Sequence, residues 1–406
     1  MSRFLQELSK RNSDPSDRNW LYVPYDQLND GMGPLARDEP NTWGIILIEN
    51  SWKASCRPYH KQKLTFILAN MRHFALEQAS RGVAVKYVFT HGLYRDALEP
   101  LLEEFGQIRV MQPAEYALRA DLQPLVDTGK VQIIPHEGWL TSEEQFYVSH
   151  KTPGPPWRMD AFYRHVRQQT GLLMEHGQPV GGKYSFDAEN RKSWRGQPVA
   201  PEVPTFPIDA IKGEVGKLIE NQFGRHPGKL DLKKLPATKA DADTLWNWAK
   251  ENCMPNFGPY EDAMSMQSTT LFHTRISSLL NIHRLLPAKV VSEAAEMDVL
   301  LSSKEGFIRQ VLGWREFMHH VHTVTRGFRT LADGSINKAT TPGDGGYSRW
   351  AGKNWENESD REFPDGGVKP CELGGDLALP SAFWGKRSGL ACLDRVVKDV
   401  WEEGYS

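Results

Sequence analysis

The chain has 406 residues, of which 39% are hydrophobic and 25% are charged. This length exceeds what one hydrophobic core usually supports, so two domains are expected. No apolar run approaches the roughly 20 residues needed to span a bilayer, and residues 1–20 lack a signal-peptide core. We therefore expect a cytoplasmic protein with no membrane partner. The net charge of −2 excludes a uniformly basic nucleic-acid-binding protein but is compatible with a local basic face.

The N-terminal third alternates between two kinds of pattern. Residues 1–18 are polar and are expected to form a flexible arm. Helical patterns at residues 60–80, 93–105 and 118–128 then separate short apolar runs rich in β-formers. These runs are Trp20–Val23, Gly44–Ile48, Val83–Phe89, Ile108–Met111 and Val131–Ile134. Alternating strands and helices predict a parallel sheet covered on both faces, so residues 19–148 should form a doubly wound, Rossmann-like α/β domain.

Three acidic residues are predicted near the carboxyl ends of these strands. Asp26 follows the first strand, Glu49 ends the second, and Glu115 lies in the turn after the fourth. Ligands of doubly wound sheets bind beyond these strand ends, which makes the three residues candidates for binding a cofactor. Alternatively, Asp26 and Glu115 only cap turns and helix starts.

Residues 149–240 are interpreted as an inter-domain segment. It opens with the Pro/Gly-rich run SHKTPGPPW, which is typical of a rigid turn. Residues Met159–Thr170 combine aromatic residues with arginines at helical spacing. This combination could grip a nucleic-acid backbone, but it is also typical of a solvated helix face with a few core anchors. Residues 195–237 are rich in proline and are expected to be irregular.

Helical patterns dominate residues 241–406, with no strand alternation, so this part is predicted to be an all-α domain. The predicted helices are Asp241–Cys253, Tyr260–Met266, Thr274–Leu286, Ala288–Ala295 and Glu305–His322. A Gly/Pro-rich insert interrupts them at residues 327–379.

The most regular helical pattern runs from Ser302 to His322. Ser302-x-x-Glu305 matches the capping box, so a helix should begin there. Apolar residues then recur at three- and four-residue spacing and predict one stripe facing the core. The stripe comprises Phe307, Ile308, Val311, Leu312, Trp314, Met318 and Val321, while Arg309, Gly313, Glu316 and His320 lie on the opposite, polar face. A glycine in mid-helix indicates either a flat or bulky group close to the backbone or ordinary helix packing.

The same stretch contains His319, His320 and His322, with Glu316 three residues before His319. Glu-x-x-His places two metal ligands on one helical face, but such sites need matching ligands from other helices. No partner motif is visible, and surface or core histidines are the simpler interpretation.

Five segments resemble the photolyase/cryptochrome superfamily, in its bacterial iron–sulfur branch of deoxyribodipyrimidine photolyase-related proteins. EGFIRQVLGWREFM (residues 305–318) resembles the flavin-domain helix, and YHKQKLTFILANMRHFA (residues 59–75) resembles the first long helix of the antenna domain. Asp26-Gln27-Leu28 resembles the turn after the first strand. Residues 162–191 resemble the inter-domain segment, and WGKRSGLACL (residues 384–393) resembles a stretch near the family's iron–sulfur cluster.

The resemblance implies that the helical domain binds FAD. LFHTRISSLLNIHRLLP (residues 271–287) resembles the family's flavin-diphosphate segment, and free N–H groups at a helix start favour phosphate. The candidate FAD residues are His273, Thr274, Ile276, Ser277 and Arg309. Alternatively, Thr274 and Ser277 are ordinary capping residues. Arg275 departs from the family, which usually has an uncharged residue there, and could either add a phosphate contact or crowd the site.

The resemblance also implies an antenna chromophore, in this family often a ribityllumazine, beside Asp26, Glu49 and Glu115. Trp384 resembles the tryptophan that passes an electron to the flavin, although a tryptophan in this position is often only a core anchor. Cys392 resembles the first metal ligand of a four-cysteine 4Fe–4S cluster, but no cysteine follows it. We therefore expect that the chain alone does not hold the cluster, that its helical domain is incomplete, and that a second chain could supply the rest.

The function implied by the resemblance is that of a light-driven, FAD-dependent DNA photolyase. Such a lyase repairs pyrimidine lesions in UV-damaged DNA, here expected to be of the (6-4) type, with an electron from reduced flavin. Two alternatives stay open: a cryptochrome-like blue-light photoreceptor without repair, and a fragment that acts only as a binding or scaffold module.

Overall fold

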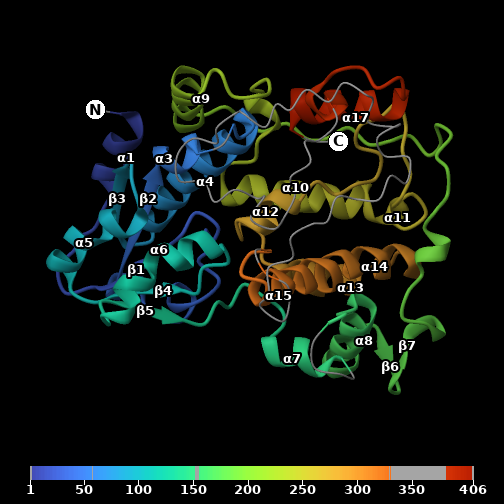
Figure 1. The fold of residues 1–406 in the computed structure, drawn as a ribbon, viewed down its shortest axis with the longest axis horizontal. Helices are drawn as coiled ribbons and strands as arrows, with labels where there is room; N and C mark the ends of the chain where they lie inside the picture. Colours follow the sequence, from blue (N-terminus) through green and yellow to red (C-terminus); the bar gives the residue numbers. More distant parts are fainter. Residues whose placement is uncertain (1, 57, 151–154, 329, 331–380, 405–406) are drawn as a thin grey trace.

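The computed structural model describes residues 2–56, 58–150, 155–328, 330 and 381–404. Figure 1 shows an α/β part that contains the sheet and, beside it, a helical part that contains the later elements. The predicted fold class of a doubly wound parallel sheet with a helical C-terminal part is confirmed. Most of the insert at residues 327–379, including Cys371, lies outside the described residues.

Five parallel strands form the main sheet in the order β3-β2-β1-β4-β5. They are β1 (Asn19–Tyr22), β2 (Trp43–Asn50), β3 (Ala84–Thr90), β4 (Ile108–Met111) and β5 (Val131–Ile134). All five coincide with the predicted runs to within a few residues. Every residue of β2 is buried, as expected for a parallel strand covered on both faces. The order reverses between β1 and β4, so the loops that follow these two strands diverge at one point of the sheet edge.

Helices cover both faces of the sheet. Helices α1 (Arg3–Arg11) and α4 (Lys61–Ser80) pack on one face, and α5 (Tyr94–Phe105) and α6 (Tyr116–Asp127) pack on the other. Helix α4 is buried around most of its circumference because it also contacts α9 (Ala210–Gln222) on the side away from the sheet. It therefore packs between the sheet and α9.

Two predictions for the N-terminal half are wrong. Residues 1–18 are not simply a flexible arm, because α1 buries Phe4 and Leu8 against the core and its N-terminal amides donate to the Glu214 carboxylate of α9. Residues 195–237 are not irregular throughout, because α9 lies within them and buries Ile211, Val215 and Ile219. In both cases a short amphipathic helix is stabilised by packing that a local pattern does not reveal.

The helical part contains short helices around one longer composite helix. Its elements are α10 (Lys239–Asn252), α11 (Met254–Phe257), α12 (Ser277–Asn281), α13 (Pro287–Glu296), α14 (Leu301–Ile308), α15 (Glu316–Val324) and α17 (Ala391–Glu403). The predicted helix at Tyr260–Met266 is absent, since this stretch forms turns. The remaining α-helices of the described residues are α2 (Pro34–Arg37), α3 (Ser51–Ser55), α7 (Glu143–Val148) and α8 (Met159–Thr170), and a hairpin is formed by β6 (Met174–Glu175) and β7 (Gln178–Pro179).

The composite helix differs from its sequence prediction. Between α14 and α15, residues Arg309–Arg315 form a π-helical segment. The helix begins at Leu301, and its N-cap, Leu300, makes no side-chain capping bond, so the predicted capping box is wrong. The Glu305 carboxylate instead accepts the backbone N–H of Phe186 at 2.9 Å.

Helix α8 carries the predicted run of basic and aromatic residues, and three of them are buried. Phe162 and Tyr163 are core residues, and Arg167 is buried with its guanidinium donating to the carbonyls of Leu172, Leu173 and Tyr184. These side chains are core anchors.

In the part of the chain that the structure describes, no helix combines the length and the apolar character needed to cross a membrane.

Candidate functional site

Four of the predicted FAD residues line one cavity in the helical part. His273, Thr274, Ile276 and Ser277 contribute to a cavity of about 480 Å³ between the loop before α12 and the π-helical segment. The cavity is also lined by Phe307, Gln310, Val311 and Arg315 of the composite helix and by Phe257 of α11. The cavity combines hydroxyl, imidazole, amide and guanidinium groups with apolar side chains, the mixture that suits a large planar ligand carrying an anionic group.

The loop before α12 is held in an unusual backbone conformation. Leu271 and Arg275 both have positive φ angles, of 42° and 57°, which non-glycine residues rarely adopt. Such strain persists only where the surroundings fix it, and it concentrates at binding sites. His273 Nε2 lies 3.1 Å from the Glu261 carbonyl oxygen. A carbonyl can only accept, so His273 Nε2–H is the donor, and this bond ties the loop to a residue that lines the cavity.

The fifth predicted FAD residue, Arg309, does not line this cavity. Its buried guanidinium faces three carboxylates, those of Asp187 at 3.2 Å, Glu305 at 3.4 Å and Glu261 at 3.5 Å. Glu261 does line the cavity and also accepts a hydrogen bond from Gln310. Arg309 therefore lies one layer behind the wall and holds Glu261 in place.

Arg315 is the lining cation that sequence reasoning missed. It belongs to the π-helical segment, and its Nε–H has no hydrogen-bond partner among the described residues. The sequence offered one indication that Arg315 could be a site residue: it follows Trp314 within residues 305–318, the segment that resembles the flavin-domain helix. Periodicity could not show that the side chain turns inward, because the π-helical segment changes the phase of the helix.

The acidic residues predicted for an antenna site do not all come together. Asp26 and Glu115 follow the adjacent strands β1 and β4. Both lie close to Tyr25, whose pKa is raised first by burial and then by the negative charges of Glu115 and Asp26. Glu115 accepts the hydroxyl of Tyr25 at 3.0 Å and forms an ion pair with Lys53. Asp26 is buried with its Oδ1 unpartnered among the described residues, and burial, followed by the charge of Glu115, raises its pKa to about 7.

Glu49 faces helix α4. Its carboxylate receives two bonds from the Arg72 guanidinium of α4, at 2.8 and 3.0 Å, and one from the Tyr87 hydroxyl at 2.9 Å. Its oxygens are therefore engaged in holding α4 on the sheet. Asp26 and Glu115 are the pair that stays together at the strand ends.

The last two predicted site residues lie away from the cavity. Trp384 is 52% exposed in a short turn and contacts Trp401 at a ring distance of 6.0 Å. Cys392 is exposed in α17, which Figure 1 shows at the opposite edge of the helical part from α15. Among the described residues no group of cysteine, histidine and carboxylate side chains could hold a metal, so a four-thiolate cluster does not fit this part of the chain.

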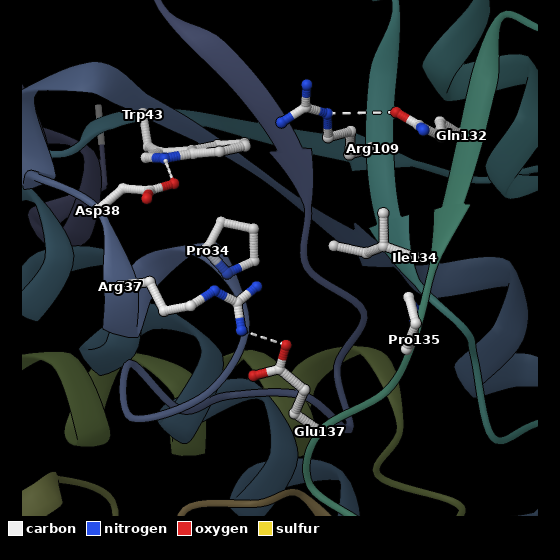
Figure 2. Close-up of a pocket in the computed structure, with 9 residues that line it drawn as sticks. All are labelled: Pro34, Arg37, Asp38, Trp43, Arg109, Gln132, Ile134, Pro135 and Glu137. Atoms are coloured by element: carbon white, nitrogen blue, oxygen red, sulfur yellow. Dashed lines mark hydrogen bonds and ion pairs between the residues drawn. The ribbon is translucent and has the colours of Figure 1, made fainter.

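Two other cavities lie in the described part of the chain. Figure 2 shows one of about 280 Å³ in the α/β part, where Arg37 pairs with Glu137, Trp43 donates to Asp38, and Arg109 donates to Gln132. The polar groups of that pocket thus largely satisfy one another. The second of them, of about 370 Å³, lies between α4 and the end of α17. It shares Arg275, Ser277 and Asn281 with the candidate FAD cavity. Helix α12 and the residue Arg275 before it therefore separate these two cavities.

A doubly wound α/β part joined to a helical part with such a cavity is the architecture that the sequence resemblance implies. The family model described as deoxyribodipyrimidine photo-lyase-related protein matches residues 21–235. The chain belongs to this family.

Individual relatives add detail. A (6-4) photolyase of Agrobacterium fabrum is 29% identical over 402 residues, covering 94% of this chain and 70% of the relative. An uncharacterized protein of Acanthamoeba polyphaga mimivirus is 25% identical over 138 residues, covering 32% of this chain and 70% of the relative. Among solved structures, a bacterial class III photolyase from Agrobacterium tumefaciens matches with a TM-score of 0.49 and 14% identity, covering 84% of this chain. The chain spans 66% of the length of that structure.

Proposed function

We propose that this protein is a light-driven, FAD-dependent photolyase that repairs pyrimidine lesions in UV-damaged DNA. The observation that carries the proposal is that His273, Thr274, Ile276 and Ser277 line one cavity in a chain of the photolyase-related family. The (6-4) photolyase relative supports a lesion of the (6-4) type.

The residues of the cavity suit an FAD molecule. The hydroxyls of Thr274 and Ser277 and the guanidinium of Arg315 would serve the anionic diphosphate and the polar ring atoms, while Phe257 and Val311 would pack on the ring faces. Bound reduced flavin would supply the electron for the repair. The protein binds and orients the flavin, excludes water and keeps the donor groups in place.

DNA would approach from the outer side of the π-helical segment. Trp314 lies there, 44% exposed, between the lining residues Val311 and Arg315. Exposed aromatic side chains bind unstacked bases, and a lesion must leave the helix to reach a flavin. Trp314 is therefore proposed to contact the flipped lesion.

The test is repair by purified protein that has been reconstituted with FAD and reduced. We expect blue light to restore pyrimidines in an oligonucleotide that contains one (6-4) lesion. The double variant Thr274→Val, Ser277→Ala should bind FAD more than about a hundredfold more weakly, since each lost hydrogen bond to a charged group removes about 1.5–3 kcal/mol. Repair of a cyclobutane dimer instead would change the assigned lesion. FAD binding without repair of either lesion would favour the photoreceptor alternative.

A further inference from the structure

Arg315 is held by residues of the α/β part that do not themselves line the cavity. We propose that the loop between β5 and α7, through Trp139 and Thr141, positions Arg315 in the cavity wall and so sets its affinity for the flavin dinucleotide. This inference rests on the proposed function, because it assigns a role to the site where FAD would bind.

The first contact is a stack of three flat groups. The Arg315 guanidinium lies 4.0 Å from the centre of the Trp139 ring. The His319 ring stacks on Trp139 at 3.6 Å, with an angle of 10° between the ring planes. Since two groups cannot occupy one ring face at such distances, Arg315 and His319 lie on opposite faces of Trp139. The indole therefore fixes the plane of the guanidinium.

The second contact passes through the neighbouring carboxylate. Glu316 is fully buried, and its Oε1 accepts Arg315 Nη1–H at 2.9 Å. Its Oε2 accepts three bonds from the loop: the N–H of Leu140 at 2.8 Å, the N–H of Thr141 at 3.0 Å and the Thr141 hydroxyl at 2.9 Å. One oxygen thus serves the arginine and the other serves the loop, so the loop determines where the carboxylate holds Arg315.

The second terminal nitrogen of Arg315 is also engaged. Nη2 lies 3.3 Å from the Leu280 carbonyl and 3.3 Å from His283 Nε2. Because arginine only donates, His283 Nε2 accepts, and His283 Nδ1–H donates to the Asp26 carbonyl at 2.6 Å. These contacts use three of the five guanidinium N–H groups, and the Nε–H has no partner among the described residues, while Arg315 as a whole lines the cavity.

The two parts of the molecule are also tied at a place that does not involve Arg315. Glu77 of α4 receives two bonds of 2.7 Å from Arg284, just after α12, and neither residue lines the cavity. Breaking this ion pair loosens the same junction without freeing Arg315. Glu77 therefore provides a matched control for a specific positioning role.

The experiment measures FAD affinity of the apoprotein by fluorescence quenching, with the melting temperature measured in parallel. We expect Glu316→Gln and Thr141→Val to weaken FAD binding about tenfold, since each removes a bond to a charged group. Thr141→Ser, which keeps the hydroxyl, should bind like wild type. Glu77→Gln should lower the melting temperature but leave FAD affinity within about twofold.

The outcomes separate the inference from the proposed function. No FAD binding by wild-type protein overturns the proposed function and this inference with it. FAD binding by wild type that is unchanged in both Glu316→Gln and Thr141→Val overturns the positioning role alone. A loss as large in Glu77→Gln, or no recovery in Thr141→Ser, also overturns it, because the effect would then be a general loosening of the fold.

Discussion

At the residue scale, the fold changes the protonation of the buried Asp26 side chain. Burial raises its pKa from 3.8 to about 7, with the charge of Glu115 as the next cause, and its Oδ1 has no partner among the described residues. The folded protein therefore keeps the Asp26 proton up to about pH 7, whereas the unfolded chain loses it near pH 4. Folding takes up a proton between these values, so the contribution of Asp26 to stability falls as the pH rises through this window and stays low above it.

Replacing Asp26 by asparagine should remove this dependence. We expect the free energy of unfolding of Asp26→Asn, relative to wild type, to increase by about 2–4 kcal/mol between pH 4 and pH 8, because one pKa unit corresponds to about 1.4 kcal/mol and relaxation recovers part of the cost. Urea unfolding of both proteins at the two pH values checks this. A difference that stays constant with pH would mean that Asp26 is already ionised in the folded protein near pH 4.

At the element scale, the π-helical segment determines which side chains of the composite helix face inward. Phe307 and Ile308 before it, and Val311 and Leu312 in its first half, are buried as predicted. From the end of the segment onward the pattern changes: Trp314 and Met318, predicted for the core stripe, are 44% and 43% exposed, while Glu316 and His320, predicted for the polar face, are buried. The wider turn adds one residue, which rotates everything that follows by about 100°. Gly313 lies in this segment, and a Cβ there would be 3.1 Å from the Met159 sulfur and 3.4 Å from the Tyr163 ring of α8, so the glycine serves ordinary helix packing, the second of the two predicted alternatives.

Deleting Gln310 should restore an ordinary α-helix and reverse that rotation. Trp314 and Met318 would turn inward, and Glu316 would leave Leu140 and Thr141. We expect the helical circular dichroism to stay nearly constant while the free energy of unfolding falls by more than about 3 kcal/mol, the usual cost of breaking a buried ion pair. The matched variant Gln310→Ala keeps the chain length and should lose less than half as much. Equal losses would show that the Gln310 side chain, and not the helix phase, matters.

The sequence predicted those features that depend on local pattern. The five strands were predictable because a strand buried on both faces is a continuous apolar run, as in β2. The grouping of His273, Thr274 and Ser277 came from the resemblance of one contiguous segment. Arg315 and the partners of Arg309 were not predictable, since a π-helical turn breaks the period on which helix patterns depend, and ion pairs between distant elements leave no local signal.

At the scale of the whole molecule, buried polar contacts tie the α/β part to the helical part. The Leu28 N–H donates to the Ile282 carbonyl at 3.0 Å, the Asn29 amide donates to the His283 carbonyl at 2.7 Å, and Arg284 binds Glu77. Loops after β1 and β5 both take part, and α4 spans the junction. Such contacts should make the two parts unfold together.

Weakening this junction should therefore lower the stability of both parts. We expect Arg284→Gln to reduce the free energy of unfolding by about 2 kcal/mol, since two bonds between charged groups are lost while Glu77 stays partly hydrated. Lys289→Gln breaks an exposed pair with Asp243 and should change it by less than about 0.5 kcal/mol. Chemical denaturation followed by far-ultraviolet circular dichroism and by tryptophan fluorescence gives the comparison. Two separate transitions in wild-type protein would contradict the joint unfolding.

The contacts of Glu316 also have a consequence for the order of events on the ribosome. The amides of Leu140 and Thr141 find their acceptor 176 and 175 residues further along the chain. At about 5–20 residues per second, roughly 10–35 s pass between synthesis of the loop and synthesis of its partner. The sheet can fold during that interval, but the loop after β5 keeps its amides in water until Glu316 emerges. The pace of translation, and not the folding rate of the sheet, then decides when Arg315 reaches its final place.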